Sequence, residues 1–141
     1  MARVADRIRS LAEVLSERPF PASPGPVKTV AQFHCHQRAT FGTTSDRGVL
    51  QAAGVSVESV DEGCCGLAGN FGFESGHYDV SVACAEEALL PALRRHPVDQ
   101  PVLADGFSCR LQIEQLAGRR AMHLAELLLD RMPIDQPPDA P

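Results

Sequence analysis

The adjacent cysteines Cys64 and Cys65, set between Gly63 and Gly66, restrict the possible fold more than any other feature of this sequence. Neighbouring cysteines rarely bond to each other, because the ring that would form strains the peptide between them. Two thiols held at nearly one point are better suited to a shared inorganic centre. Glycines beside them let backbone N–H groups approach such a centre closely. The rest of the chain is therefore expected to bring further ligands to this pair.

Strand and helix patterns alternate along the chain, which favours an α/β fold. The predicted strands cover residues 27–33, 55–60, 101–104 and 121–123. We expect an open, mostly parallel sheet of about four strands with flanking helices. Ligands of such sheets bind beyond the carboxyl ends of the strands, so the metal site is expected there.

Helical spacing of apolar residues predicts the remaining elements. The first helix is expected over residues 3–17, and the second starts at a cap among Thr43, Thr44 and Ser45 and stops at Gly54. A third runs over 78–90 and is kinked or ended by Pro91. The last two are expected from Cys109 to Ala117, capped by Ser108, and from Leu124 to a point before Pro133.

The chain is expected to divide into four segments. Residues 1–18 predict a leading amphipathic helix, residues 19–26 a proline-rich linker, residues 27–132 a compact cysteine-rich unit, and residues 133–141 a disordered tail. A length of 141 residues allows one hydrophobic core of useful size.

Charge and composition narrow the classes of partner. Lys and Arg number 13 against 18 Asp and Glu, giving a net charge of −5, whereas nucleic acids and anionic membranes require a concentrated basic surface. The chain shows neither a bilayer-length apolar run nor a secretory signal, so we expect a cytoplasmic protein without a membrane span. Its 5 cysteines, an odd number, favour metal or redox chemistry over disulfides there.

Four cysteines follow three successive predicted strands. Cys35 comes after the first strand, Cys64 and Cys65 after the second, and Cys109 after the third, so we expect the four to converge as metal ligands. Thiolates suit iron–sulfur clusters or zinc. A short Cys-x-x-Cys knuckle is missing and two ligands are adjacent, which favours a cluster of several irons over one tetrahedral ion.

The remaining candidates surround this centre. Cys84 lies within a predicted helix and is expected to pack in the core. His34 and His36 alternate across the end of a strand, so at most one of them is expected to face the centre. Residues predicted to support the ligands from outside are His34, His36, Gly66 and His123.

Three aromatic residues and one charged pair have two interpretations each. Phe71, Phe73 and Phe107 either close over the centre and exclude water, or pack as ordinary core aromatics. Arg110 and Asp105, which lie close to Cys109, either form a surface ion pair or meet a partner.

From about Val27 to Met132 the chain resembles the cysteine-rich CCG domain of heterodisulfide reductase subunits and of the iron–sulfur subunits of glycolate, lactate and glycerol-3-phosphate oxidoreductases. It looks most like the carboxyl-terminal segment of FAD-linked oxidases or dehydrogenases of 2-hydroxy acids. The motifs that carry the resemblance are His34-Cys35-His36, Gly63-Cys64-Cys65-Gly66-Leu67-Ala68-Gly69, Ala104-Asp105-Gly106-Phe107-Ser108-Cys109-Arg110 and His123-Leu124-Ala125-Glu126.

The resemblance implies an iron–sulfur cluster, expected to be of the [4Fe–4S] type, that relays electrons between an acceptor and FAD on a partner domain or subunit. The isolated chain, which shows no flavin motif or substrate base, is then expected to lack turnover. The family pattern ends in Cys-x-x-Cys, whereas this chain keeps only Cys109. That difference argues against the non-cubane cluster and the disulfide cleavage associated with heterodisulfide reductase.

Two alternatives remain open at this point. In one, the cysteines hold zinc in a structural or docking module. In the other, Cys64 or Cys65 acts directly in thiol–disulfide exchange.

Overall fold

A computed structural model describes residue 4 and residues 7–22, 25–60 and 63–133. Strand β1 (Val27–Ala31) pairs with β2 (Val55–Ser59) on one side and with β3 (Val102–Leu103) on the other, and β4 (Ala121–Met122) follows β3. All of these pairings are parallel, and the strand order is β2-β1-β3-β4. The predicted α/β fold with a parallel sheet is confirmed.

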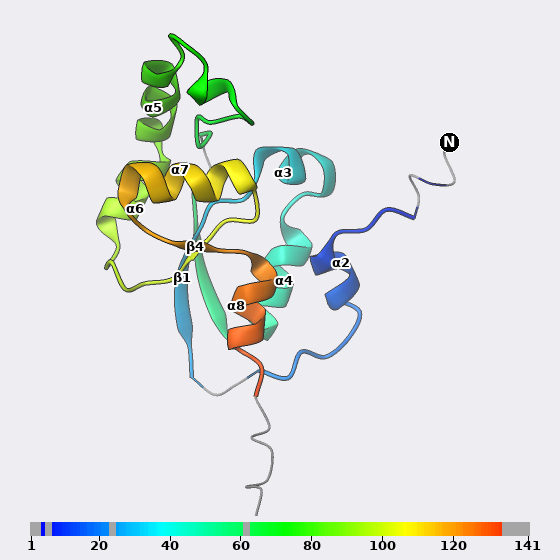
Figure 1. Cartoon of the computed structure of the whole chain (residues 1–141). Helices are drawn as coiled ribbons and strands as arrows, with labels where there is room; N and C mark the ends of the chain where they lie inside the picture. Colours follow the sequence, from blue (N-terminus) through cyan, green and yellow to red (C-terminus); the bar gives the residue numbers. More distant parts are fainter. Residues whose placement is uncertain (1–3, 5–6, 23–24, 61–62, 134–141) are drawn as a thin grey trace, which may run out of the picture.

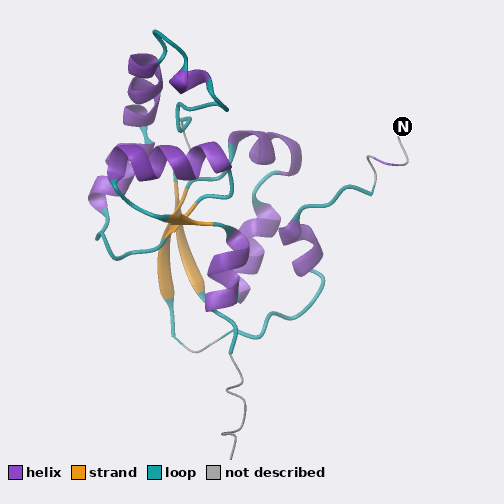
Figure 2. Ribbon diagram, in the orientation of Figure 1, coloured by secondary structure: helices purple, strands orange, loops and turns teal. Residues whose placement is uncertain are grey.

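Helices cover both faces of this sheet, so the fold has three layers (Figures 1 and 2). Val30 and Val102 point to a core shared with α5 (Tyr78–Glu87), α6 (Leu89–Arg95) and α7 (Phe107–Ala117). Their strand neighbours Ala31 and Leu103 point to the opposite core. That second core is shared with α2 (Leu11–Leu15), α4 (Thr44–Ala52) and α8 (Leu124–Asp130). Successive side chains of a strand alternate between the two faces, so each strand serves both cores.

The leading helix is shorter than predicted. Helix α2 begins at Leu11, because Ser10 caps it: the Ser10 hydroxyl accepts from the Glu13 N–H, and the Glu13 carboxylate accepts from the Ser10 N–H. Residues 8–10 lie outside any helix, and part of the predicted range lies outside the described residues. The chain before α2 leads away from the body of the molecule (Figure 1).

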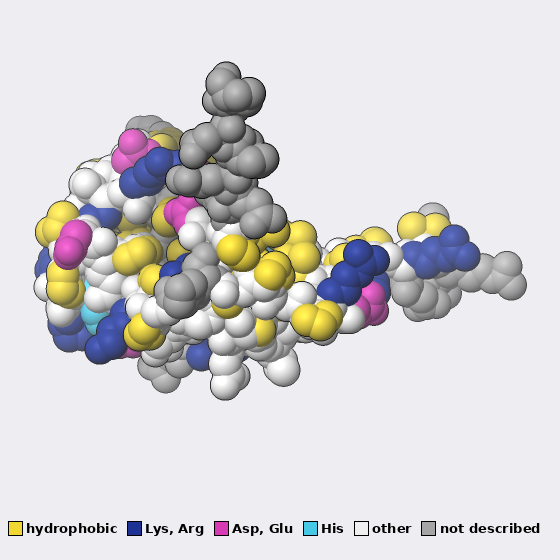
Figure 3. All heavy atoms as spheres, turned by 90° about the horizontal axis from the view of Figure 1, so that it is seen from below, with side chains coloured by type: hydrophobic (Ala, Val, Ile, Leu, Met, Phe, Trp, Pro, Cys, Tyr) yellow, Lys and Arg dark blue, Asp and Glu magenta, His cyan; other side chains and the backbone are white. Residues whose placement is uncertain are grey.

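This leading segment presents apolar and basic side chains together. Figure 3 shows apolar and basic side chains next to one another on the segment that leads to α2. Its exposed apolar residues are Val4, Ile8, Leu11 and Val14. Ala12 alone of the α2 residues is fully buried, in the second core.

Two helices differ from the prediction. Helix α3 (Cys35–Phe41) was not predicted, since none of its residues is buried and it therefore lacks an apolar period. The helix expected over 78–90 ends at Glu87, and α6 starts after Ala88. Pro91 lies in the first turn of α6, where a missing N–H is tolerated.

Some of the predicted helix caps and helix ends are confirmed by the structure, and one cap is wrong. Gly118 ends α7 in the left-handed conformation, and Gly54 follows α4, as expected. Gly106, not Ser108, is the N-cap of α7. Ser108 lies inside the helix, where its hydroxyl accepts from the Gly69 N–H at 3.2 Å.

Candidate cysteine centre

The candidate site lies beyond the carboxyl ends of the parallel strands. Cys35 is the first residue of α3 after β1, Cys64 and Cys65 follow β2, and Cys109 lies in the first turn of α7 after β3. Strand order reverses between β1 and β3, which is where ligands of open α/β sheets bind. His123 occupies the corresponding position after β4.

Of the four candidate ligands, Cys65 and Cys109 are the two buried cysteines. A hydrogen bond from the Cys109 thiol is the largest cause that lowers the pKa of Cys65, to about 6. The same hydrogen bond, followed by burial, raises the pKa of Cys109. The two thiols therefore titrate as a pair, and their hydrogen bond makes the first proton easier to remove than that of a free cysteine.

Cys64 and Cys35 lie within electrostatic range of this pair. Burial raises the pKa of the half-buried Cys64, and the charges of Cys65 and Cys35 raise it further. The charges of Cys35 and Cys64 also act on Cys109. The four cysteines predicted as ligands thus lie within range of one another's charge, and Cys35 is the exposed one.

Three consecutive backbone N–H groups point at the sulfur atoms of the double cysteine. The Gly66 N–H donates to Cys64 Sγ at 3.3 Å, and the N–H groups of Leu67 and Ala68 donate to Cys65. This turn needs positive φ at Gly66 (88°) and at Ala68 (44°). Consecutive N–H groups of this kind stabilise anions, and N–H bonds to sulfur tune the potential of iron–sulfur clusters.

The donor set fits a soft metal centre in its chemistry. It consists of four thiols, one of them with a lowered pKa, with N–H donors to two of the sulfurs. Within the described residues, however, no three or more His, Cys, Asp and Glu side chains already stand in metal-binding geometry. The role of the four thiols as ligands therefore stays a prediction.

His34 lies beside Cys109, with Gly106 next to both side chains. A Cβ added to Gly106 would overlap the His34 ring and would come within 3.1 Å of Cys109 Sγ. Gly106 thus allows His34 to pack beside Cys109. The His34 and His36 rings are 5.5 Å apart and both line one cavity. The strand alternation expected for them does not apply, because β1 ends at Ala31 and both lie at the start of α3.

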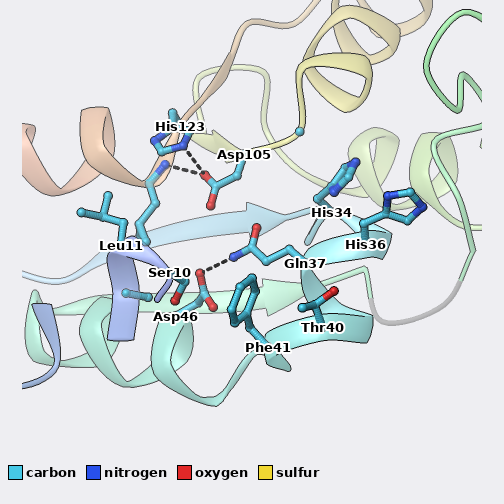
Figure 4. A pocket seen from close by; sticks show the side chains of 13 residues that line it. Ser10, Leu11, His34, His36, Gln37, Thr40, Phe41, Asp46, Asp105 and His123 are labelled. Atoms are coloured by element: carbon cyan, nitrogen blue, oxygen red, sulfur yellow. Dashed lines mark hydrogen bonds and ion pairs between the residues drawn. The ribbon is translucent and has the colours of Figure 1, made fainter. Parts of the chain in front are cut away.

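This cavity of about 430 Å³ is lined by residues of α2, α3, α4 and α8 and by Asp105 and Gly106, which precede α7 (Figure 4). Asp46 is only 2% exposed, and its carboxylate accepts from the Gln37 amide at 2.8 Å. Burial, followed by the charge of Asp105, raises the pKa of Asp46. Asp105 accepts from the Leu124 N–H at 2.6 Å and faces the ring of His123 at 3.8 Å. The cavity has no Lys or Arg among its described lining residues.

Asp46 is the site residue that the sequence interpretation missed. It precedes Val49, Leu50 and Ala53 by three, four and seven positions, which places it on the buried face of α4. A carboxylate at a buried helical position was the signal that could have found it. His123 caps α8: its Nδ1 accepts from the Ala125 N–H at 3.0 Å.

Other predicted residues are placed differently from expectation. Cys84 is half-buried on α5 and is not part of either core. Phe73 and Phe107 are 54% and 73% exposed, which overturns the interpretation of these two residues as core aromatics. The Arg110 guanidinium donates to the backbone carbonyl of Asp105 at 3.0 Å.

The known proteins to which this chain is similar are dehydrogenases. The chain is 30% identical over 121 residues to D-2-hydroxyglutarate dehydrogenase of Pseudomonas putida, covering 84% of this chain and 11% of that protein. The same enzyme of Pantoea ananatis is 33% identical over 99 residues, which are 69% of this chain and 10% of that protein. One subunit of the anaerobic glycerol-3-phosphate dehydrogenase of Escherichia coli is 30% identical over 110 residues, which are 77% of this chain and 27% of that polypeptide.

The chain thus spans about a tenth of the 2-hydroxyglutarate dehydrogenases and about a quarter of the glycerol-3-phosphate dehydrogenase polypeptide. No family model matches the sequence, and no solved structure matches it. Among the described residues, the helices are all too short or too polar to cross a membrane.

Proposed function

We propose that this chain is the iron–sulfur electron-transfer domain of a larger, flavin-dependent oxidoreductase of the 2-hydroxy-acid type. The observation that carries the proposal is the gathering of four thiols at one sheet edge, with backbone N–H groups aimed at two of the sulfurs. Similarity to dehydrogenases that are several times longer supports a role as one domain among others. A cluster bound there would accept and release single electrons.

In this proposal Cys35, Cys64, Cys65 and Cys109 hold the cluster, which we expect to be [4Fe–4S]. The chain's own groups prepare the site in two ways. Cys109 and the N–H groups of Leu67 and Ala68 lower the pKa of Cys65, which favours the thiolate, the form that binds metal. Burial of Cys65 and Cys109 restricts water at the sulfurs.

Substrate oxidation is assigned to a partner domain or subunit that carries FAD. The substrates named for the relatives, 2-hydroxyglutarate and glycerol 3-phosphate, are anions. The cavity beside His34 and His36 contains the carboxyls of Asp46 and Asp105, and its described lining lacks Lys and Arg. Such a lining offers an anionic substrate no permanently charged partner, so the chemistry on the substrate is expected outside this chain.

The experiment is anaerobic purification followed by analysis of iron, sulfide and zinc and by visible spectroscopy. We compare the wild type with Cys65→Ser and use Cys84→Ser as the matched control, because Cys84 lies within α5 and does not follow a strand as the four predicted ligands do. Several irons per chain with broad absorption, lost in Cys65→Ser and kept in Cys84→Ser, are expected. Stoichiometric zinc without colour would refute the relay and support a structural or docking module.

A second function is favoured by one specific observation. Cys65 has a lowered pKa and lies beside the thiol of Cys109, and a thiol–disulfide oxidoreductase needs such a pair. This function predicts a metal-free protein with thiol-dependent reductase activity that is lost in Cys65→Ser. Protection of Cys65 by bound metal would exclude it.

A further inference from the structure

Ser81 and Gln112 form a buried hydrogen bond that joins α5, which contacts the loop after Cys65, to α7, which carries Cys109. The Gln112 amide on α7 donates to the Ser81 hydroxyl on α5 at 3.0 Å, and both residues are buried. We infer that Ser81 and Gln112 are positioning residues, which hold the Cys64–Cys65 turn against the helix of Cys109. The inference rests on the proposed function and concerns the same centre.

Ser81 touches the glycine loop at two places. A Cβ at Gly66 would overlap the backbone carbonyl of Ser81, and a Cβ at Gly72 would overlap its side chain. The Gly72 N–H donates to the Leu67 carbonyl at 3.2 Å, which closes the loop between these two contacts. Ser81 therefore contacts both ends of the loop that follows the double cysteine, with its backbone at Gly66 and with its side chain at Gly72.

Gln112 connects Ser81 to α7, the helix that carries Cys109. It follows Cys109 by three residues on α7, and residues at this spacing lie on the same side of a helix. A buried amide without a partner would be costly, so the bond to Ser81 fixes the side chain in one arrangement. The relative position of α7 and the glycine loop is fixed with it.

The conformation of this loop determines whether its N–H groups can reach the sulfur atoms of Cys64 and Cys65. The N–H groups of Gly66, Leu67 and Ala68 can donate to Cys64 and Cys65 only while the loop keeps its conformation. Ala68 is held at a φ of 44°, which is unfavourable for a residue with a side chain. Without support from Ser81, the loop is expected to leave this conformation.

The test is site-resolved amide hydrogen exchange on the full chain as purified. The variants are Ser81→Ala, which removes one oxygen, and the double variant Ser81→Ala/Gln112→Met, which leaves neither group unpaired. The matched control is Thr29→Val. Thr29 is also a buried hydroxyl, and it donates to the Pro101 carbonyl at 2.8 Å before β3 begins.

We expect exchange at Gly66, Leu67 and Ala68 to become about tenfold faster in both Ser81 variants, while amides of β1 change less than about twofold. In Thr29→Val these loop amides should keep their wild-type rates. Equal acceleration of the loop and β1 in the Ser81 variants, or unchanged loop exchange, would overturn the inference. Metal analysis does not enter this result, so failure of the positioning role and failure of the proposed function are distinguished.

Discussion

Gly66 is the residue at which a single added carbon conflicts most directly with the site. Its φ of 88° favours glycine, and a Cβ would overlap the Ser81 backbone. Gly69 offers a matched control, since its φ is 75° but a Cβ there meets nothing within 4 Å. Gly69→Ala is expected to cost about 1 kcal/mol of unfolding free energy, for the left-handed conformation alone. Gly66→Ala should cost about 3 kcal/mol or more, because backbone atoms must also move.

Urea unfolding of both variants measures this difference. Equal losses at the two positions would show that the Ser81 backbone does not limit the turn. Metal content should follow the same order, with Gly66→Ala depleted and Gly69→Ala close to the wild type.

Asp46 predicts a pH dependence that can be measured at one side chain. Burial and the charge of Asp105 raise its pKa, so the folded state disfavours the ionised form. A raised carboxyl pKa contributes stability below the unfolded-state pKa, and this contribution is lost as pH rises through the folded-state value. Asp46→Asn cannot ionise and still accepts from Gln37. It should therefore raise the free energy of unfolding at about pH 7 and change it little at about pH 3.

Urea titrations of both proteins at the two pH values provide the check. A stability gain of the same size at both would assign the effect to packing and not to ionisation.

Among the contacts between elements, the hydrogen bonds of Arg119 connect the end of α6 to the segment before β3. Its guanidinium donates to the carbonyls of Leu93 at 2.9 Å and Gln100 at 2.6 Å, and the residue is 7% exposed. The side chain of Arg120 next to it is 81% exposed and pairs with Glu126 at 3.0 Å. Arg119→Ala should lower the free energy of unfolding by about 3 kcal/mol, since two carbonyls lose a buried cationic donor.

Arg120→Ala is the control for this substitution and should stay within about 0.5 kcal/mol of the wild type, as exposed ion pairs contribute little. Thermal unfolding of both variants measures the difference. Similar shifts of the midpoint would show that the Arg119 bonds do not hold α6 in place.

The same elements show what the sequence can predict. The four strands, and the position of each candidate cysteine after its strand, could be predicted from apolar residues in the sequence. Those residues are apolar because each strand contributes side chains to the two cores. Helix α3 could not be found this way, because it buries no residue and is set by its place after β1. The histidines beside Cys35 were consequently assigned to a strand end, and their shared orientation toward the cavity was missed. The contacts of Ser81 with the glycine loop join residues of separate elements, and no local pattern encodes them.

At the scale of the whole molecule, the sheet separates the cysteine centre from half of the hydrophobic core. Cys65 and Cys109 belong to the core under α5, α6 and α7, while the core under α2, α4 and α8 contains no cysteine among its described residues. A group that binds only the folded state stabilises the elements that it contacts. Removal of the proposed metal centre should therefore loosen one face of the sheet more than the other.

Hydrogen exchange before and after anaerobic iron chelation tests this expectation on the metal-loaded protein. Protection should fall in residues 63–73 and in the first turns of α7, because their cysteines lose a shared ligand. Helices α4 and α8 should keep their protection, since the buried Leu50, Leu124 and Leu128 pack on the opposite face. Cys65→Ser should resemble the chelated protein without further change on chelation. An equal loss of protection on both faces would mean that the two cores unfold as one unit, and that the centre stabilises the whole sheet and not one side of it.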